Sequence, residues 1–197
     1  MKFLLVADEE SPYIWDYFDI ERYRDVDLII SAGDLKAQYL EFLVSMIPVD
    51  LLYVHGNHDD GYDDNSPLGC ICIENDIYIH KGIRILGLGG SYRYSNGKHQ
   101  YTELEMQKRI NKLKRKIKKH KGFDILVAHS PAFGHGDGKD LAHRGFECFN
   151  ELIRTYKPKY FIHGHQHMNY GWNQKRIYSI DETTCINAYM YHKLEYV

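Results

Sequence analysis

Acidic, amide and imidazole side chains recur in this sequence at the ends of short apolar runs. Asp8 follows the run Lys2–Ala7, and Gly33 and Asp34 follow the run Val26–Ala32. The same arrangement recurs at three later places, which are Gly56-Asn57-His58-Asp59, His129 and Gly164-His165-Gln166-His167. Carboxylates, an amide oxygen and neutral imidazoles are ligands that suit Mn, Fe or Zn ions, and no thiolate lies among them. These residue types therefore predict a metal centre, provided that the fold brings them together.

The apolar runs have the length of buried strands, and helical stretches separate them. The first third of the chain predicts strands at Lys2–Ala7, Val26–Ala32 and Asp50–Val54, with helices at Pro12–Tyr23 and Ala37–Met46. Strands that alternate with helices of this length form right-handed crossovers in a parallel sheet. Because the carboxyl ends of parallel strands converge at one edge, where ligands bind, we expect the five polar groups to meet there.

The rest of the chain adds further strands and helices. It predicts a hairpin of Ile77–His80 and Ile83–Leu88, a long loop over 89–97, a helix from Thr102 to about Lys121, a strand at Asp124–Ala128, a helix at Gly145–Thr155, a strand at Tyr160–Ile162 and short β segments at Trp172, Ile177–Tyr178, Cys185–Ala188 and Lys193–Tyr196. Thr102 and Glu105 have the spacing of a capping box at the start of the long helix. An α/β pattern in the first part of the chain, followed by a β-rich C-terminal part, predicts two packed sheets flanked by helices.

Composition limits the class of protein. The chain has 197 residues, of which 44% are hydrophobic and 26% charged, so we expect one globular domain over 1–197. A net charge of -2 gives no general attraction to nucleic acid or membrane. No apolar run approaches the roughly 18 residues of a membrane span, and the four cysteines lack zinc-type spacing. We therefore expect a cytoplasmic protein with reduced thiols and no membrane partner.

The ordered motifs resemble those of the calcineurin-like metallophosphoesterases, from Asp8 through Gly33-Asp34 and Gly56-Asn57-His58-Asp59 to His129 and Gly164-His165-Gln166-His167. The resemblance implies an α/β four-layer double β-sandwich, in which two mixed sheets are flanked by helices. It also implies a metal-dependent hydrolase of phosphate mono- or diesters, in which metal-activated hydroxide attacks phosphorus. The compact chain has no obvious specificity module, which favours a small phosphodiester or nucleotide-like substrate.

The resemblance further implies a role for each motif residue. One metal ion would be held by Asp8, Asp34 and His167, and a second by Asp34, Asn57, His129 and His165. His58 would stabilise the phosphate or donate a proton to the leaving oxygen, and Asp59 would fix the orientation and the protonation state of His58. The cofactor would be two divalent ions, with Mn favoured and Fe, Zn or Mg as alternatives.

One position departs from the family pattern. The first motif is normally Asp-x-His, whereas this chain has Asp8-Glu9-Glu10. Either Glu10 binds the first metal in place of an imidazole, which would favour harder cations such as Mn or Mg, or Glu10 turns outward and the first site is weak.

The loop between Pro131 and Gly145 is rich in glycine, histidine and aspartate and follows His129. A long loop at the active edge suits substrate recognition, with His143 or Arg144 contacting a phosphate oxygen. The alternative is a solvated loop that leads into the next helix.

The segment Lys108–Lys121 carries nine Lys and Arg residues in fourteen. It would serve a nuclease as a phosphate-backbone patch, but we favour the solvent face of an amphipathic helix. A non-catalytic interaction scaffold is a further alternative, because the first motif is altered at Glu10. The sequence makes no prediction of oligomeric state.

Overall fold

The computed structural model describes residues 1–169 and 175–197, so the β segment expected at Trp172 lies outside the described residues. The first sheet has the order β13-β1-β2-β3-β4 and consists of β1 (Lys2–Ala7), β2 (Leu28–Ser31), β3 (Leu51–Tyr53), β4 (Ile71–Cys72) and β13 (Met190–Glu195). The second has the order β11-β12-β10-β9-β6-β5 and consists of β5 (Ile77–His80), β6 (Ile83–Leu88), β9 (Ile125–Ala128), β10 (Tyr160–His163), β11 (Ile177–Ile180) and β12 (Thr183–Asn187). The helices are α1 (Pro12–Trp15), α2 (Ala37–Met46), α3 (Glu103–Lys119) and α4 (Glu147–Tyr156).

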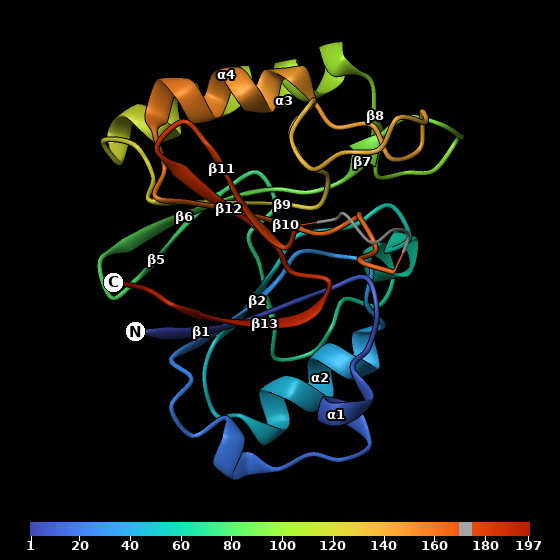
Figure 1. The fold of residues 1–197 in the computed structure, drawn as a ribbon, viewed down its shortest axis with the longest axis vertical. Helices are drawn as coiled ribbons and strands as arrows, with labels where there is room; N and C mark the ends of the chain where they lie inside the picture. Colours follow the sequence, from blue (N-terminus) through green and yellow to red (C-terminus); the bar gives the residue numbers. More distant parts are fainter. Residues whose placement is uncertain (170–174) are drawn as a thin grey trace.

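The two sheets pack face to face, with α1 and α2 outside the first and α3 and α4 outside the second (Figure 1). Strand alternation explains this, because successive side chains point to opposite faces. In β1, Phe3 and Leu5 enter the core between the sheets, whereas Leu4 and Val6 pack toward α2. The predicted four-layer double β-sandwich is confirmed.

Both sheets are mixed, as predicted, and their parallel strands determine where polar residues emerge. β1, β2, β3 and β4 are parallel, and β13 pairs antiparallel with β1. In the second sheet β6, β9, β10 and β12 are parallel, with β5 and β11 antiparallel at the edges. The carboxyl ends of β1 and its parallel neighbours lie on the right in Figure 1.

The long helix α3 has the predicted capping box, in which the Thr102 hydroxyl accepts from the Glu105 N–H and the Glu105 carboxylate accepts from Thr102. Its apolar stripe is buried as expected. The next helix, α4, begins two residues later than predicted and is capped from a distance. The Glu103 carboxylate of α3 accepts hydrogen bonds from the N–H groups of Glu147 and Cys148, at 3.1 and 2.7 Å.

Two predicted elements differ in the structure. The helix expected over Pro12–Tyr23 ends at Trp15, and a separate 3-10 turn follows at Ile20–Arg22. The Asp19 carboxylate accepts from the Glu21 N–H, and a side-chain cap of this kind competes with a continuous helix. The loop expected over 89–97 contains β7 (Ser91–Tyr92), which pairs with β8 (Gln100–Tyr101) in a third, two-stranded sheet.

Among the described residues, no helix combines the length and the apolar character needed to cross a bilayer.

Candidate metal centre

Three of the predicted ligands have a left-handed backbone within three residues of the end of a strand. The φ angle is 67° at Asp8, 58° at Asp34 and 68° at His165. This conformation costs a residue with a side chain roughly 1–2 kcal/mol. Backbone strain of this kind persists only where the surrounding structure enforces it, and it clusters at functional sites.

Two glycines allow the loops after β2 and β3 to approach each other. A Cβ atom at Gly33 would lie 2.4 Å from the Gly56 nitrogen, and a Cβ at Gly56 would lie 2.0 Å from Asp34 Oδ1. Any side chain at Gly56 would therefore displace the Asp34 carboxylate. The backbone N–H of Asp8 also donates to the Gly33 carbonyl at 3.0 Å, which joins the loops after β1 and β2.

Backbone contacts fix the tautomers of two buried histidines. His129 Nδ1 lies 2.8 Å from the Ala32 carbonyl, and His165 Nε2 lies 2.6 Å from the Ala142 carbonyl. A carbonyl oxygen only accepts, so these nitrogens carry the protons. His129 Nε2 and His165 Nδ1 are thereby left to face each other at 3.1 Å.

Oxygen atoms complete a set of four converging donors. Asn57 Oδ1 lies 3.0 Å and Asp34 Oδ2 lies 3.2 Å from His129 Nε2, which also faces His165 Nδ1. A proton on His129 Nε2 satisfies only part of this set, whereas a cation at the centre contacts all four atoms. Zn–N bonds of about 2.0–2.1 Å leave ligand atoms a little over 3 Å apart. The residues present therefore fit a metal ion.

Electrostatics also favour a cation here. Burial lowers the pKa of His165 to about 3, so its imidazole is neutral. Burial also acts to lower the pKa of His129, but the charge of Asp34 outweighs it and raises that pKa to about 9. Although burial opposes ionisation of Asp34, its contacts with His129 hold the carboxyl pKa below the ordinary range. The site thus favours positive charge beside Asp34, which a divalent ion would supply.

The Asp8 carboxylate is buried at the edge of this group. Asp8 Oδ1 accepts from the His165 backbone N–H at 2.8 Å, and Oδ2 is buried without a hydrogen-bond partner among the described residues. Burial, with the charge of Asp34, raises the pKa of Asp8 to about 7. A buried carboxylate oxygen without a hydrogen-bond partner fits a ligand of the first of the two predicted metal ions. His167 lines the same pocket of about 390 Å³, and its ring packs on Tyr189.

His58 and Asp59 lie at the mouth of the site. The His58 side chain is exposed, and its backbone N–H donates to Asp34 Oδ1 at 2.7 Å. Asp59 Oδ2 accepts from the N–H groups of Gly56 and Asp34, at 2.7 and 2.8 Å. Asp59 therefore joins the loops that present Asp34 and Asn57, and its predicted action on the His58 ring stays a prediction.

The altered motif places its two glutamates differently. Glu10 lines a pocket with Asp8, and its Oε1 accepts from the Lys36 N–H at 3.3 Å, at the start of α2. The Glu9 carboxylate accepts a hydrogen bond from the Tyr189 hydroxyl, whose ring packs on His167. These contacts favour the outward alternative for Glu10.

Tyr94 makes a contact with a proposed ligand that the sequence did not predict. Its hydroxyl accepts from Asn57 Nδ2 at 3.1 Å, which turns Asn57 Oδ1 toward His129. Tyr94 also lines the pocket with His58 and His167. A tyrosine in the loop after β7 carries no local signal of this contact.

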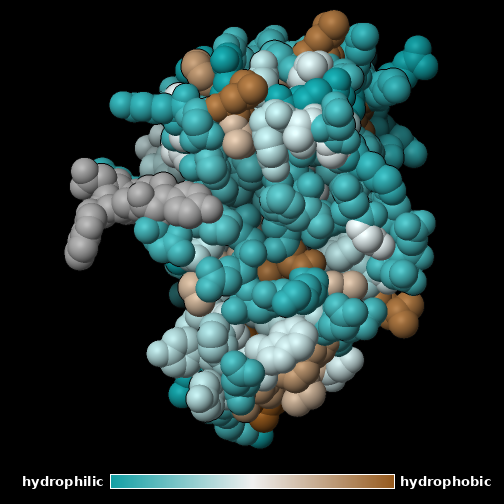
Figure 2. Space-filling model, turned by 90° about the vertical axis from the view of Figure 1, so that its right-hand side faces the viewer, coloured by the Kyte–Doolittle hydropathy of each residue, from teal (hydrophilic) through white to brown (hydrophobic). Residues whose placement is uncertain are grey.

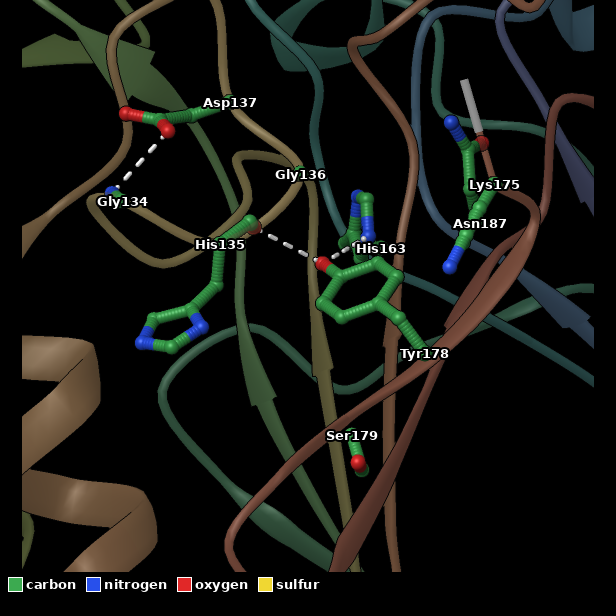
Figure 3. Close-up of a pocket in the computed structure, with 9 residues that line it drawn as sticks. All are labelled: Gly134, His135, Gly136, Asp137, His163, Lys175, Tyr178, Ser179 and Asn187. Carbon is green, nitrogen blue, oxygen red and sulfur yellow. Dashed lines mark hydrogen bonds between the residues drawn. The ribbon is translucent and has the colours of Figure 1, made fainter. Parts of the chain in front are cut away.

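A second cavity, of about 420 Å³, lies beside the strand that precedes the His165 loop, and His163 and Tyr178 line it (Figure 3). His163 Nδ1 lies 2.9 Å from the Gly164 carbonyl, and its Nε2 lies 2.8 Å from the Tyr178 hydroxyl, which donates to the His135 carbonyl at 2.9 Å. Burial lowers the pKa of His163 to about 4, which agrees with a neutral ring between two partners. His163 therefore supports the loop that carries His165.

The two residues of the loop after β9 that were predicted to contact substrate, His143 and Arg144, have different surroundings. His143 lines the pocket, with its ring 5.5 Å from that of His165 and its Nδ1 2.9 Å from Asp140. Arg144 lies over the ring of Phe133 and pairs with Glu147 at 2.9 Å. Contact with substrate therefore stays a prediction for both residues, and the geometry favours His143.

A further group with ligand atoms close together consists of His55, Asp63 and His99. The two imidazoles are stacked, with centroids 4.4 Å apart and planes 16° apart. An imidazole binds a cation in the plane of its ring, so one ion cannot lie in both stacked planes. Asp63 also pairs with Lys98 at 3.1 Å. This group is structural.

Comparison with known proteins agrees with the geometry. A model of the calcineurin-like phosphoesterase family matches residues 1–169. An uncharacterized protein of Haemophilus influenzae is 26% identical over 208 residues, which cover 90% of this chain and 88% of that protein. A UPF0046 protein of Caenorhabditis elegans is 24% identical over 206 residues, which cover 86% of this chain and 69% of the relative.

Among solved structures, TT1561 of Thermus thermophilus matches with a TM-score of 0.65 and 14% identity, over 95% of this chain and 88% of that one. This similarity shows a shared fold. The extent of the family match, over a chain whose strand ends carry the motif residues, shows that the protein belongs to the calcineurin-like phosphoesterase family.

Proposed function

We propose that this protein hydrolyses small phosphodiesters or nucleotide-like phosphate esters with two divalent ions, of which Mn²⁺ is favoured. The observation that carries the proposal is the convergence of His129 Nε2 and His165 Nδ1, 3.1 Å apart, with oxygens of Asp34 and Asn57. Membership of a phosphoesterase family supports the reaction type.

The proposed ligand sets are those that the family resemblance implies. One ion is assigned to Asp8, Asp34 and His167, and the other to Asp34, Asn57, His129 and His165. Bound cations supply positive charge that activates water and neutralises the phosphate. Hard carboxylate and amide oxygens in the set favour Mn²⁺ over a softer ion.

The chain's own residues orient the ester and move the proton. Hydrolysis forms a bond from a water oxygen to phosphorus and breaks the bond from phosphorus to the leaving oxygen. His58, exposed at the junction of two pockets, donates the proton that the leaving oxygen needs. His143 lines the same pocket, and we assign its ring a contact with a phosphate oxygen.

The contacts of the basic segment Lys108–Lys121 give little support to a nuclease function. Arg109 points inward to the Glu74 carboxylate and the Gly89 carbonyl, and Lys116 pairs with Asp76 at 2.7 Å. We therefore propose a small substrate rather than nucleic acid. Four free cysteines support a reducing compartment such as the cytoplasm.

The test is hydrolysis of bis-p-nitrophenyl phosphate and p-nitrophenyl phosphate with added Mn²⁺, before and after chelation. We expect turnover that chelation abolishes and Mn²⁺ restores. Asp34→Asn should lose both activity and bound metal, because Asp34 belongs to both proposed ligand sets. Absence of turnover of either ester by protein that elemental analysis shows to hold metal would contradict the proposal and favour a scaffold.

A further inference from the structure

The pocket beside the proposed metal centre continues toward α1. Asp8, Asp34 and His58 line a pocket of about 500 Å³ that Glu10 and Lys36 also line. Glu10 and Lys36 in turn line a second pocket, of about 220 Å³, together with Pro12, Trp15 and Asp16. Glu10 and Lys36, whose charged groups pair at 3.7 Å, lie between the two pockets, and a ligand whose phosphate lies at the metal centre would reach Trp15 by passing over this pair.

Trp15 is held rigidly on one side and exposed on the other. Its indole stacks on Tyr39, with centroids 5.1 Å apart and planes 19° apart, and packs at 5.6 Å on Phe42. Trp15 nevertheless keeps 38% of its surface exposed, whereas its neighbour Ile14 is fully buried. A large aromatic ring, fixed from behind and open in front, is a stacking surface for a planar group.

The rest of the small pocket suits a polar heterocycle better than a lipid or an alkyl chain. Pro12 and Trp15 give it apolar walls, and Glu10, Asp16 and Lys36 give it hydrogen-bonding groups of both signs. Figure 2 looks onto this edge of the molecule and shows pale and brown side chains below its hollowed centre, over α1 and α2. A nucleobase has both a flat apolar face and a polar edge.

We propose that Trp15 is a specificity residue that stacks on the base of a nucleoside ester while the phosphate lies at the metal centre. This inference rests on the proposed function, because it places the phosphate among Asp8, Asp34 and His58. It narrows the substrate class to phosphate esters whose leaving group carries a planar base. His58 lines the pocket on the route to Trp15, as a proton donor to that leaving group must.

The first experiment measures binding by fluorescence on rapid mixing, before turnover. The chain has two tryptophans, Trp15 and Trp172, so Trp172→Phe leaves Trp15 as the only indole. With Mn²⁺ present, AMP should quench the fluorescence of this variant, and ribose 5-phosphate, which lacks the base, should not. Equal quenching by both compounds, or by neither, would overturn the proposal.

The second experiment uses the otherwise unaltered chain. AMP should inhibit hydrolysis of bis-p-nitrophenyl phosphate about tenfold more strongly than ribose 5-phosphate, since stacking on an aromatic ring contributes about 1–3 kcal/mol. Trp15→Ala should remove this difference and Trp15→Phe should keep most of it. Tyr17→Ala, at a tyrosine that is 72% exposed and outside the pocket lining, is the matched control and should retain the full difference.

The two proposals fail separately. A chain that hydrolyses the test ester but inhibits equally with AMP and ribose 5-phosphate keeps the proposed function and loses the role of Trp15. A chain that hydrolyses no ester loses the proposed function, and the fluorescence of Trp172→Phe still decides whether Trp15 binds a base.

Discussion

The direction of one amide is decided by a tyrosine hydroxyl. Because Tyr94 accepts from Asn57 Nδ2, the carbonyl oxygen of Asn57 faces His129. An amide that flips would present its NH₂ group to the cation instead. The contact between Tyr94 and Asn57 therefore supports metal binding without Tyr94 being a ligand.

Tyr94→Phe should weaken Mn²⁺ binding about tenfold, as loss of a partner that orients a metal ligand commonly does. Titration calorimetry measures the affinity. Tyr92→Phe is the matched control from the adjacent strand β7, because the Tyr92 ring packs on Phe146 rather than on a proposed ligand. Equal affinities for Tyr94→Phe and wild type would show that Asn57 needs no orienting partner.

Glu10→Ala tests the altered first motif. Since Glu10 Oε1 accepts from the Lys36 N–H, we expect the variant to bind as many metal ions as the wild type. Elemental analysis of the purified proteins counts the ions. Loss of one ion in Glu10→Ala would show that Glu10 turns inward to bind metal. In that case Glu10→His, which restores the usual imidazole of the motif, should bind the lost ion again.

At the scale of elements, one buried carboxylate ties three of them together. Glu74 accepts from the N–H of His55 after β3 at 3.2 Å and from the N–H of Gly89 after β6 at 2.9 Å. It also pairs with Arg109 of α3. Glu74 thus joins the ends of strands from both sheets close to the loop that carries Asn57.

Glu74→Gln should destabilise the fold by about 3 kcal/mol, because it leaves the buried Arg109 without its counter-ion. Urea unfolding measures the free energy of unfolding. Glu151→Gln, on the exposed face of α4, is the matched control and should change it little. A loss below 1 kcal/mol in Glu74→Gln, in urea at neutral pH, would show that Arg109 finds other partners.

The stabilisation by Glu74 should depend on pH. Burial opposes its ionisation, but His55 and Arg109 outweigh burial and hold the pKa of Glu74 below its ordinary value of 4.5. A carboxyl with a lowered pKa stabilises the fold fully above the unfolded value and loses this effect as pH falls through the folded value. The difference between wild type and Glu74→Gln should therefore shrink below pH 4.5 in acid unfolding. A constant difference would contradict this linkage.

At the scale of the whole molecule, the proposed site lies where the two sheets meet. Asp8, Asp34 and Asn57 follow strands of the first sheet, whereas His129 and His165 follow strands of the second. The ion assigned to Asp34, Asn57, His129 and His165 would therefore join the two sheets and bind only the folded chain.

Mn²⁺ at about a hundred times its dissociation constant should stabilise the fold by about 2.7 kcal/mol. For a chain of this size, that raises Tm by roughly 5–10 °C. Differential scanning calorimetry measures the shift, and chelation should reverse it. Asp34→Asn should abolish most of the shift, and an undiminished shift in that variant would place the stabilising ion elsewhere.

Much of the fold could be predicted from local patterns. The hairpin of β5 and β6 matches its predicted ranges, and the capping box of α3 forms as its spacing requires. These features depend on neighbours in the sequence. The helix at Pro12 ends early because the Asp19 side chain caps another turn, and α4 is capped by Glu103, which lies 44 and 45 residues away. Such competing contacts have no local pattern.

By itself, the sequence determined which polar residues follow which strands, since strand period and apolar runs are local properties. It also identified the family through the order of those motifs. Only the tertiary structure decided the distances between ligand atoms, which depend on contacts such as that of Asp8 with His165, 157 residues apart. The same holds for Tyr94 and Trp15, whose roles arise from packing between distant segments. The residue type determines which chemistry a side chain can perform. The orientation of that side chain depends on neighbours that are distant in the sequence and come together only in the folded chain.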